Sequence, residues 1–371
     1  MKHELERIEV PGEHDARGRT WRVVESAFAE RQPVERASHW PRVAAIALAL
    51  AALFAAALSP PGRAVLDEVR EVVGVEGAQP GLFSLPAPGR LLVTSEAGIW
   101  VVQQDGSKRL LGDYREASWS PFGRFVAAAR ENELAALEPN GDVRWTLARA
   151  GVRSPRWAGT ETDTEIAYVD RTGIRVVAGD GTGDKLLTAG ARDPIAWRPG
   201  AGFVLAYTTS RTVRVVDGET GQALWKASRP PGRVTAVEWS SDGRRLLVLT
   251  PHHLRVYDSR GRVVDQESPA EGWPDVGAAF RPRSHEVGVA RVHGSQSTAY
   301  VLSSRTLFNG MGVFRELEWA PTGRWVLVTW QSADQWVFVR ADGSRIQAVS
   351  NISEQFRSRA FPRVEGWCCA P

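Results

Sequence analysis

The two cysteines are the residues of this chain whose type points most directly to chemistry. Cys368 and Cys369 are adjacent, and the chain has no others. One adjacent pair cannot supply a four-ligand zinc site or a framework of disulfides. Three interpretations are therefore open: two small thiols in a closing strand, a strained disulfide between neighbours if the domain lies in an oxidising compartment, or a metal or redox role.

The histidines and glycine-rich loops form no recognisable catalytic constellation. The chain has no Gly-x-Ser-x-Gly elbow and no His-Glu-x-x-His sequence. His252 and His253 form the one adjacent histidine pair, and neighbours on a strand face opposite sides, which disfavours a shared metal. Gly179–Lys185 superficially resembles a phosphate loop but lacks the Gly-Lys-Ser/Thr ending and a following helix. We therefore predict a turn there, no catalytic residue, no metal and no cofactor.

The charge distribution argues against a nucleic-acid partner. The 46 basic residues are nearly balanced by 43 acidic ones, and no dense Lys/Arg run occurs. Nearly all the basic residues are arginine, which together with the many alanines and glycines indicates a GC-rich bacterial genome. The hydrophobic content of 43% is ordinary for a globular chain with a buried core.

An internal repeat organises most of the chain. Its clearest copies read Trp-Ser-Pro-Phe-Gly-Arg from Trp119, Trp-Ser-Ser-Asp-Gly-Arg from Trp239 and Trp-Ala-Pro-Thr-Gly-Arg from Trp319. Weaker copies bring the starts to seven: Leu85, Trp119, Trp157, Trp197, Trp239, Phe280 and Trp319. Each start is followed by β-rich runs and, in six copies, by a Gly-containing turn such as Asp105-Gly106, which closes a tight hairpin. The sixth copy lacks this glycine, so its hairpin is the weakest part of the pattern.

About four short strands in each repeat of ~40 residues are typical of a β-propeller. We predict an all-β fold of seven blades, with six or eight as alternatives, in which the repeat tryptophans pack between adjacent blades. The first repeat lacks its first strand. Gln355–Pro362 resembles that strand, with Phe361-Pro362 in the place of Trp-Ser-Pro, so we expect the C-terminal segment to close the ring.

The three clearest copies resemble the TolB-type, WD40-like propeller repeat. The resemblance covers about residues 85–362 and departs from true WD40 repeats, because the paired Gly-His and Trp-Asp dipeptides are absent. It implies a periplasmic or extracytoplasmic propeller used for protein–protein contact.

A hydrophobic run near the N-terminus predicts a membrane anchor. Val43–Leu58 carries no charge and is apolar on all sides; Trp40 precedes it and Pro60-Pro61 ends it. The run is short, because a span needs about 17–25 apolar residues. A cleaved signal peptide and a buried helix are the alternatives. The arginines just before the run place the N-terminus in the cytoplasm and the large domain outside: Arg31, Arg36 and Arg42.

The N-terminal tail contains a second candidate site. Trp21, Val24 and Phe28 fall at i, i+3 and i+7, on one face of a short helix. This face is a docking site for a cytoplasmic regulator, or else the tail is a partly helical segment next to the membrane. The predicted organisation is a tail (1–42), a transmembrane anchor (43–58), a stalk or linker helix (59–80) and a propeller (81–371).

These features favour a single-pass protein of a bacterial cell membrane, with a non-enzymatic extracytoplasmic propeller that binds an unknown protein or senses a ligand. A transmembrane regulator is a more specific version, similar in layout to some anti-sigma proteins, although the zinc-type Cys/His signature of many of them is absent. The alternative is an enzyme that uses the mouth of the propeller channel. Clustered carboxylates or histidines at that mouth would favour it.

Overall fold

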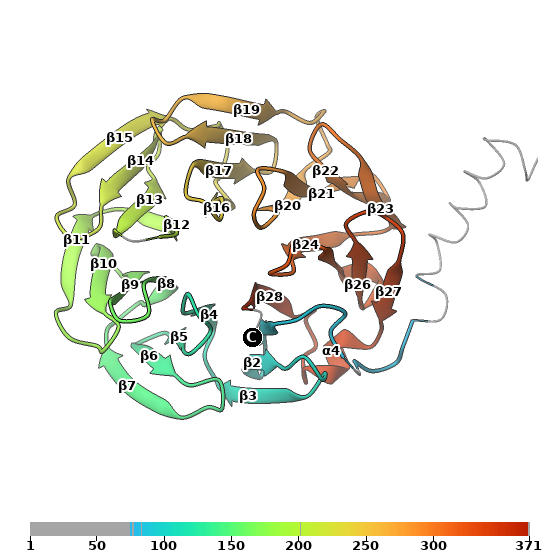
Figure 1. The fold of residues 1–371 in the computed structure, drawn as a ribbon, viewed down its shortest axis with the longest axis horizontal. Coiled ribbons are helices and arrows are strands. Elements are labelled where there is room, and N and C mark those ends of the chain that lie inside the picture. The colour runs from blue at the N-terminus through green and yellow to red at the C-terminus, as the bar shows by residue number, and fades with distance from the viewer. Residues whose placement is uncertain (1–74, 76–77, 83, 201, 370–371) are drawn as a thin grey trace, which may run out of the picture. The chain divides into compact units, whose positions relative to one another are not determined.

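Seven four-stranded antiparallel sheets, arranged as a ring, make up the part of the chain that the structure describes (Figure 1). This computed structural model describes residues 75, 78–82, 84–200 and 202–369. Two compact units divide the chain, Met1–Arg63 and Ala64–Pro371, and all described residues belong to the second. The predicted tail, the predicted anchor and most of the predicted stalk lie outside the described residues, as do Trp21, Val24 and Phe28.

In each blade, the strands are named in order from the one nearest the ring axis to the one at the rim (Figure 1). Blade 1 differs from the others because its innermost strand comes from the C-terminus. Blades 1 to 4 consist of β28 (Arg363–Cys368), β1 (Arg90–Ser95), β2 (Gly98–Val102), β3 (Lys108–Gly112); β4 (Glu116–Trp119), β5 (Val126–Arg130), β6 (Glu133–Leu137), β7 (Val143–Ala148); β8 (Arg153–Gly159), β9 (Thr164–Val169), β10 (Gly173–Ala178), β11 (Lys185–Ala189); and β12 (Arg192–Trp197), β13 (Val204–Thr208), β14 (Thr212–Asp217), β15 (Ala223–Ser228).

The remaining three blades follow the chain without interruption. They consist of β16 (Ala236–Trp239), β17 (Arg245–Thr250), β18 (His253–Asp258), β19 (Val263–Glu267); β20 (Asp275–Phe280), β21 (Val287–His293), β22 (Gln296–Val301), β23 (Thr306–Met311); and β24 (Phe314–Trp319), β25 (Trp325–Trp330), β26 (Gln335–Arg340), β27 (Ile346–Val349). Blade 7 also carries the short 3-10 segment η2 (Gln331–Ala333), and α4 (Ile352–Gln355) precedes the closing strand. Among the described residues, no helix is long and apolar enough to cross a membrane.

The burial of each strand follows from its position in the blade. The middle strands are covered on both faces by neighbouring blades, and the sequences VLAYT of β13 and WVLVTW of β25 are almost entirely buried. The rim strands face solvent on one side, so β7 and β15 alternate between exposed and half-buried residues. In the sequence, each middle strand is therefore a continuous apolar run, and each rim strand is a run in which more exposed and less exposed residues alternate.

The core consists of seven hydrophobic clusters, one between each pair of adjacent blades. The prediction that the repeat tryptophans pack between blades is confirmed. The indole N–H groups of Trp197, Trp239 and Trp319 also donate to main-chain carbonyls on the inner strand of the preceding blade, at 2.9, 3.3 and 3.3 Å. Because one cluster joins blade 7 to blade 1, the ring is closed.

The C-terminal segment closes the ring, as predicted, but the predicted residues are wrong. The closing strand is β28, which pairs antiparallel with β1, and not Gln355–Pro362. That earlier segment contains the end of α4, and Phe361 packs in the cluster between blades 7 and 1. Trp367, near the end of β28, takes the place of the repeat tryptophan in blade 1.

Two predictions about turns can be compared with the structure. Gly179–Lys185 forms the connection between β10 and β11, so the turn interpretation is confirmed. The hairpin of the sixth repeat also forms, although it lacks the expected glycine. Ser303 adopts a left-handed backbone with φ of 55° there, between β22 and β23.

Candidate binding site at the channel mouth

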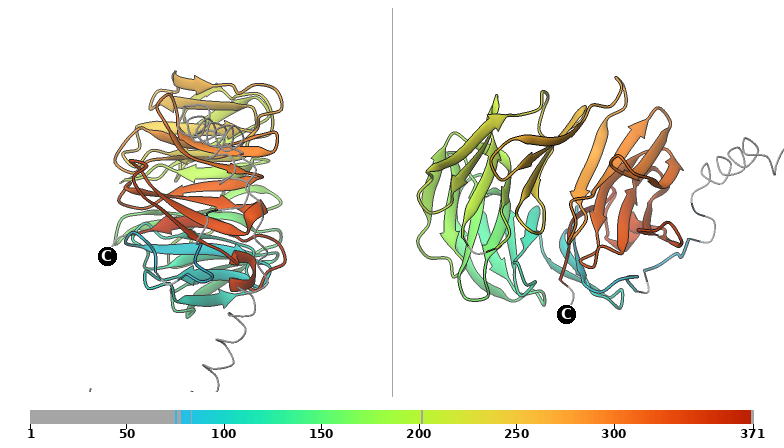
Figure 2. Two further views of the ribbon diagram at one scale, coloured as in Figure 1. Left: turned by 90° about the vertical axis from the view of Figure 1, so that its right-hand side faces the viewer. Right: turned by 45° about the horizontal axis from the view of Figure 1, so that its top comes forward.

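The ring has two faces, and its strands turn or connect at each of them (Figure 2). One face carries the loops from each rim strand to the inner strand of the next blade, together with the turns between the second and third strands; we call it the connection face. The turns that follow the repeat tryptophans lie on the opposite face, because consecutive strands are antiparallel.

A charged cavity near the ring axis opens on the connection face. Its volume is about 1260 Å³. Loops of blades 3, 4 and 5 form most of its wall, and the inner strands of blades 1, 2 and 3 complete it. We call this cavity the arginine mouth, because six arginines line it against three acidic residues: Arg156, Arg192, Arg214, Arg229, Arg233 and Arg363, with Glu116, Asp193 and Glu365.

Three of the six arginines are held by other groups. Arg363 pairs with Glu365 at 2.7 Å and lies 3.8 Å from Glu316. The guanidinium of Arg229 donates to main-chain carbonyls, including that of Ser210 at 2.9 Å. Arg156 donates to the carbonyl of Pro155 at 2.8 Å. These side chains shape the wall of the mouth and have part of their hydrogen-bonding capacity already occupied.

The other three arginines have no such partner. The side chains of Arg192, Arg214 and Arg233 are exposed and make no hydrogen bond or ion pair with any residue that the structure describes. The acidic residues of the mouth do not neutralise them. Asp193 is paired with Arg153 at 3.0 Å, and Glu116 accepts the main-chain N–H of Ser154. The mouth therefore carries uncompensated positive charge.

Carboxylates lie along the inner strands of other blades. Glu238 accepts the main-chain N–H of Phe280 at 3.0 Å, and Glu318 accepts that of Trp367 at 3.3 Å. Each of these glutamates thus links its blade to the next one. Burial raises the pKa of Glu238 to about 8, with a further contribution from the charge of Glu318, and burial raises the pKa of Glu318 to about 7.

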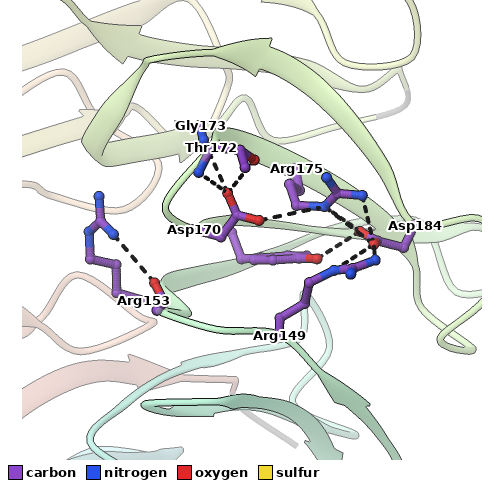
Figure 3. Close-up of polar contacts among 9 residues, drawn as sticks. Arg149, Arg153, Asp170, Thr172, Gly173, Arg175 and Asp184 are labelled. Atoms are coloured by element: carbon purple, nitrogen blue, oxygen red, sulfur yellow. Dashed lines mark hydrogen bonds and ion pairs between the residues drawn. The ribbon is translucent and has the colours of Figure 1, made fainter.

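A separate polar cluster joins blades 2 and 3 (Figure 3). The carboxylate of Asp184 accepts hydrogen bonds from Arg149, from Arg175 at 2.8 Å and from the hydroxyl of Tyr168 at 2.7 Å. Burial alone would raise the pKa of Asp184, but these hydrogen bonds hold it below its ordinary value. Every charged group of this cluster is satisfied within it, so we interpret it as structural.

A second group of cavities surrounds Phe122 on the opposite face. Phe122 is 47% exposed and borders a cavity of about 550 Å³ between blades 2 and 3. It replaces the Asp242 and Thr322 of the other clear repeats. Both arginines that line this cavity are paired, Arg124 with Glu161 at 3.4 Å and Arg144 with Glu138 at 3.2 Å. This cavity therefore offers less uncompensated positive charge than the arginine mouth.

Of the site residues predicted from sequence, the described pair, Cys368 and Cys369, does not line the arginine mouth. Cys368 and Cys369 are joined as a disulfide at the end of β28, with their sulfurs beside the carbonyls of Ser120 and Pro121 in blade 2. No group of three or more His, Cys, Asp or Glu residues in the described part of the chain is arranged to hold a metal ion. The mouth arginines were missed because they occupy unequal positions in their repeats.

Comparison with known proteins supports the fold. No protein-family model matches the sequence, and no curated protein sequence is significantly similar to it. A chain in the crystal structure of a mitotic checkpoint complex is 15% identical, with a TM-score of 0.50 over 62% of this chain and 74% of that one. The C-terminal WD40 domain of Sif2 is 14% identical, with a TM-score of 0.53 over 72% and 84%. At this identity the likeness shows a WD40-like seven-bladed β-propeller.

Proposed function

We propose that this protein is a membrane-anchored, extracytoplasmic β-propeller that acts as a non-enzymatic interaction or sensing module and binds its partner at the arginine mouth. The observation that carries the proposal is the set of three exposed arginines that line one cavity of about 1260 Å³ and have no side-chain partner among the described residues. Propeller loops at the channel mouth are suited to recognition, since a rigid ring positions loops that are free to vary.

Chemical crosslinking of the intact protein in its own membrane, followed by identification of the crosslinked proteins, tests the interaction function. Because the loops of the connection face contain few lysines, the reagents should react with carboxyl groups or with arginine. We expect them to join a defined partner to these loops. A protein that gives no specific crosslink at any face under these conditions would contradict the proposal.

The anchor rests on the sequence of Val43–Leu58, and the orientation rests on the arginines that precede it. Protease treatment of sealed cells tests both. When the outer envelope is opened and the cell membrane stays sealed, protease should cut an extracytoplasmic propeller. A tag before residue 42 should stay protected until that membrane is lysed. A propeller that resists protease until lysis would show that the orientation is wrong.

The regulatory version of the proposal concerns the tail. A helix that presents Trp21, Val24 and Phe28 would bind a cytoplasmic regulator such as a sigma factor. A peptide of residues 1–42 should capture that regulator, and the same peptide with these three residues replaced by alanine should not. Equal capture by both peptides, or capture by neither, would count against it.

An enzyme that uses the channel is the second candidate, because the structure does place carboxylates on the inner strands. Glu238 and Glu318, with raised pKa values, have the protonation behaviour of general acids near neutral pH. Each also accepts a main-chain N–H, which explains it without catalysis. A substrate screen with wild type and with Glu238→Gln/Glu318→Gln tests this candidate. Turnover by wild type that the double variant loses would favour an enzymatic function.

A further inference from the structure

The three unpartnered arginines lie on separate elements of two blades. Arg192 begins β12, Arg214 lies in the third strand of blade 4, and Arg233 precedes β16 of blade 5. All three line the same cavity, so their positive charges act together on whatever enters it. A ligand that supplies negative charge would be attracted by all three.

The neighbouring acidic groups do not occupy the free arginines. Glu365 is engaged by Arg363 and by the hydroxyl of Thr94, so it does not reach the free arginines as a counter-ion. Glu238 and Glu318 lie further along the inner strands, next to the repeat tryptophans. A negatively charged ligand is therefore attracted to the arginines of the mouth rather than to the carboxyl groups beyond it.

The chemistry and size of the mouth select the class of ligand. Guanidinium groups bind carboxylates through two parallel N–H donors, and Arg holds this geometry better than Lys. The cavity of about 1260 Å³ is larger than the range of about 300–1,000 Å³ usual for small molecules. Its free arginines come from three elements, so one small anion would not engage them as well as a chain of spaced carboxylates.

We infer that the arginine mouth binds an extended, acidic segment of a partner protein, with several Asp or Glu side chains spaced along it. Pro194 and Val234, which line the same cavity, offer apolar surface between the charges for the backbone and methylene groups of such a segment. This inference rests on the proposed interaction function and adds the chemistry of the partner.

Fluorescence anisotropy of the detergent-solubilised full-length protein tests this directly. The probes are a labelled oligoglutamate peptide of about ten residues, which extends over about 33 Å, and an oligoglutamine peptide of equal length. We expect the first to bind and the second not to bind. Raising NaCl from about 0.05 to 0.5 M should weaken binding, because exposed charges are screened.

The variant Arg192→Gln/Arg214→Gln/Arg233→Gln should raise the Kd for oligoglutamate by about tenfold or more, since hydrogen bonds between charged groups are lost. The matched control is Arg260→Gln/Arg283→Gln/Arg345→Gln, which removes the same charge from exposed arginines on the opposite face and should keep the Kd within about twofold. All six positions are exposed, so both variants should melt like wild type.

Three results would overturn the inference: equal affinity of wild type and the mouth variant, equal loss in the mouth variant and the control, or binding of anionic lipid vesicles without binding of the peptide. The proposed interaction function is tested by a different experiment, crosslinking in the membrane. A mouth variant that still crosslinks its partner in the membrane would leave the interaction function intact and refute only the acidic-segment site.

Discussion

Individual glutamates tie the inner strands of this ring together. Glu116 in β4 and Glu316 in β24 each accept a main-chain N–H from the inner strand of the next blade, as Glu238 and Glu318 do. A buried carboxylate is costly unless it is hydrogen-bonded or protonated. The raised pKa values of Glu238 and Glu318 show the second response, because one main-chain donor does not fully replace the solvent lost.

The stability of the propeller should therefore fall as pH rises from about 4.5 to about 8 at these two positions. A carboxyl whose pKa is raised by folding binds its proton more tightly in the folded state. Its contribution is complete below the ordinary pKa and is lost as pH passes the raised value. Glu238→Gln/Glu318→Gln mimics the protonated pair, so it should be more stable than wild type by a few kcal/mol near pH 9 and should differ little from it near pH 4.

Thermal melting of both proteins across this pH range measures the effect. The variant Glu131→Gln/Glu219→Gln, which changes two exposed glutamates in turns, replaces the same number of carboxyl groups and serves as the control. A double variant that is destabilised at high pH would mean that the negative charge itself holds the blades together.

Asp184 represents the opposite case, a carboxylate that is fully compensated. Its side chain is only 8% exposed and bonds to two arginines and a tyrosine (Figure 3). Asp184→Ala leaves Arg149 without its ion pair and Arg175 with only the longer pair to Asp170 at 3.8 Å, and it should cost about 3–5 kcal/mol, which urea unfolding would detect. Asp105→Ala, which removes an exposed aspartate bonded only to Ser107, should cost about 1 kcal/mol or less. Equal costs would contradict the structural role of the cluster.

At the level of elements, the closing strand completes a repeat that is divided between the two ends of the domain. Trp367 in β28 supplies the tryptophan, and Gly89-Arg90 at the start of β1 supply the Gly-Arg ending. Arg90 donates to the carbonyl of Gly123 in blade 2 at 2.6 Å, as Arg281 does to Gly323 in blade 7 at 2.7 Å. The two arginines thus reach a repeat glycine of the next blade from different positions, since Arg281 directly follows the start of its repeat and Arg90 ends its own.

Deletion of residues 363–371 should abolish cooperative unfolding, because it leaves the edge of β1 without its paired strand and the cluster between blades 7 and 1 incomplete. Calorimetry of this truncation should show a broad or absent transition. Deletion of residues 1–42, which lie in the other compact unit, should leave the transition of the propeller in place. A sharp, unshifted transition after the C-terminal deletion would refute closure by β28.

The divided repeat also explains what the sequence reveals and what it hides. Six starts are predictable because the residue that marks each repeat, such as Trp239, also packs between blades, and in five of them a Gly turn follows. The register of the closing strand is not predictable from the sequence, because Trp367 and Gly89 lie at opposite ends of the domain. Phe361-Pro362 also resembles the start of the Trp-Ser-Pro pattern. The mouth is hidden for a related reason: Arg192, Arg214 and Arg233 sit at different places in two repeats, and only the ring brings them to one cavity.

On the scale of the whole domain, seven inter-blade clusters make the ring one rigid platform with two distinct faces. The connection face holds the arginine mouth, and the opposite face holds tight turns such as Asp342-Gly343-Ser344. A rigid platform with a charged mouth on one face is suited to hold a partner without changing shape itself.

The central claim, that this face binds the partner, is tested most directly by site-specific photocrosslinking in the native membrane. A photoreactive amino acid replaces Ser210, an exposed residue of the arginine mouth, or Ser344, an exposed residue of the opposite face. We expect a discrete crosslinked partner from position 210 that is absent from position 344 and lost when Arg192, Arg214 and Arg233 are changed to Gln. A partner crosslinked from position 344 alone, or from neither position, would contradict the claim.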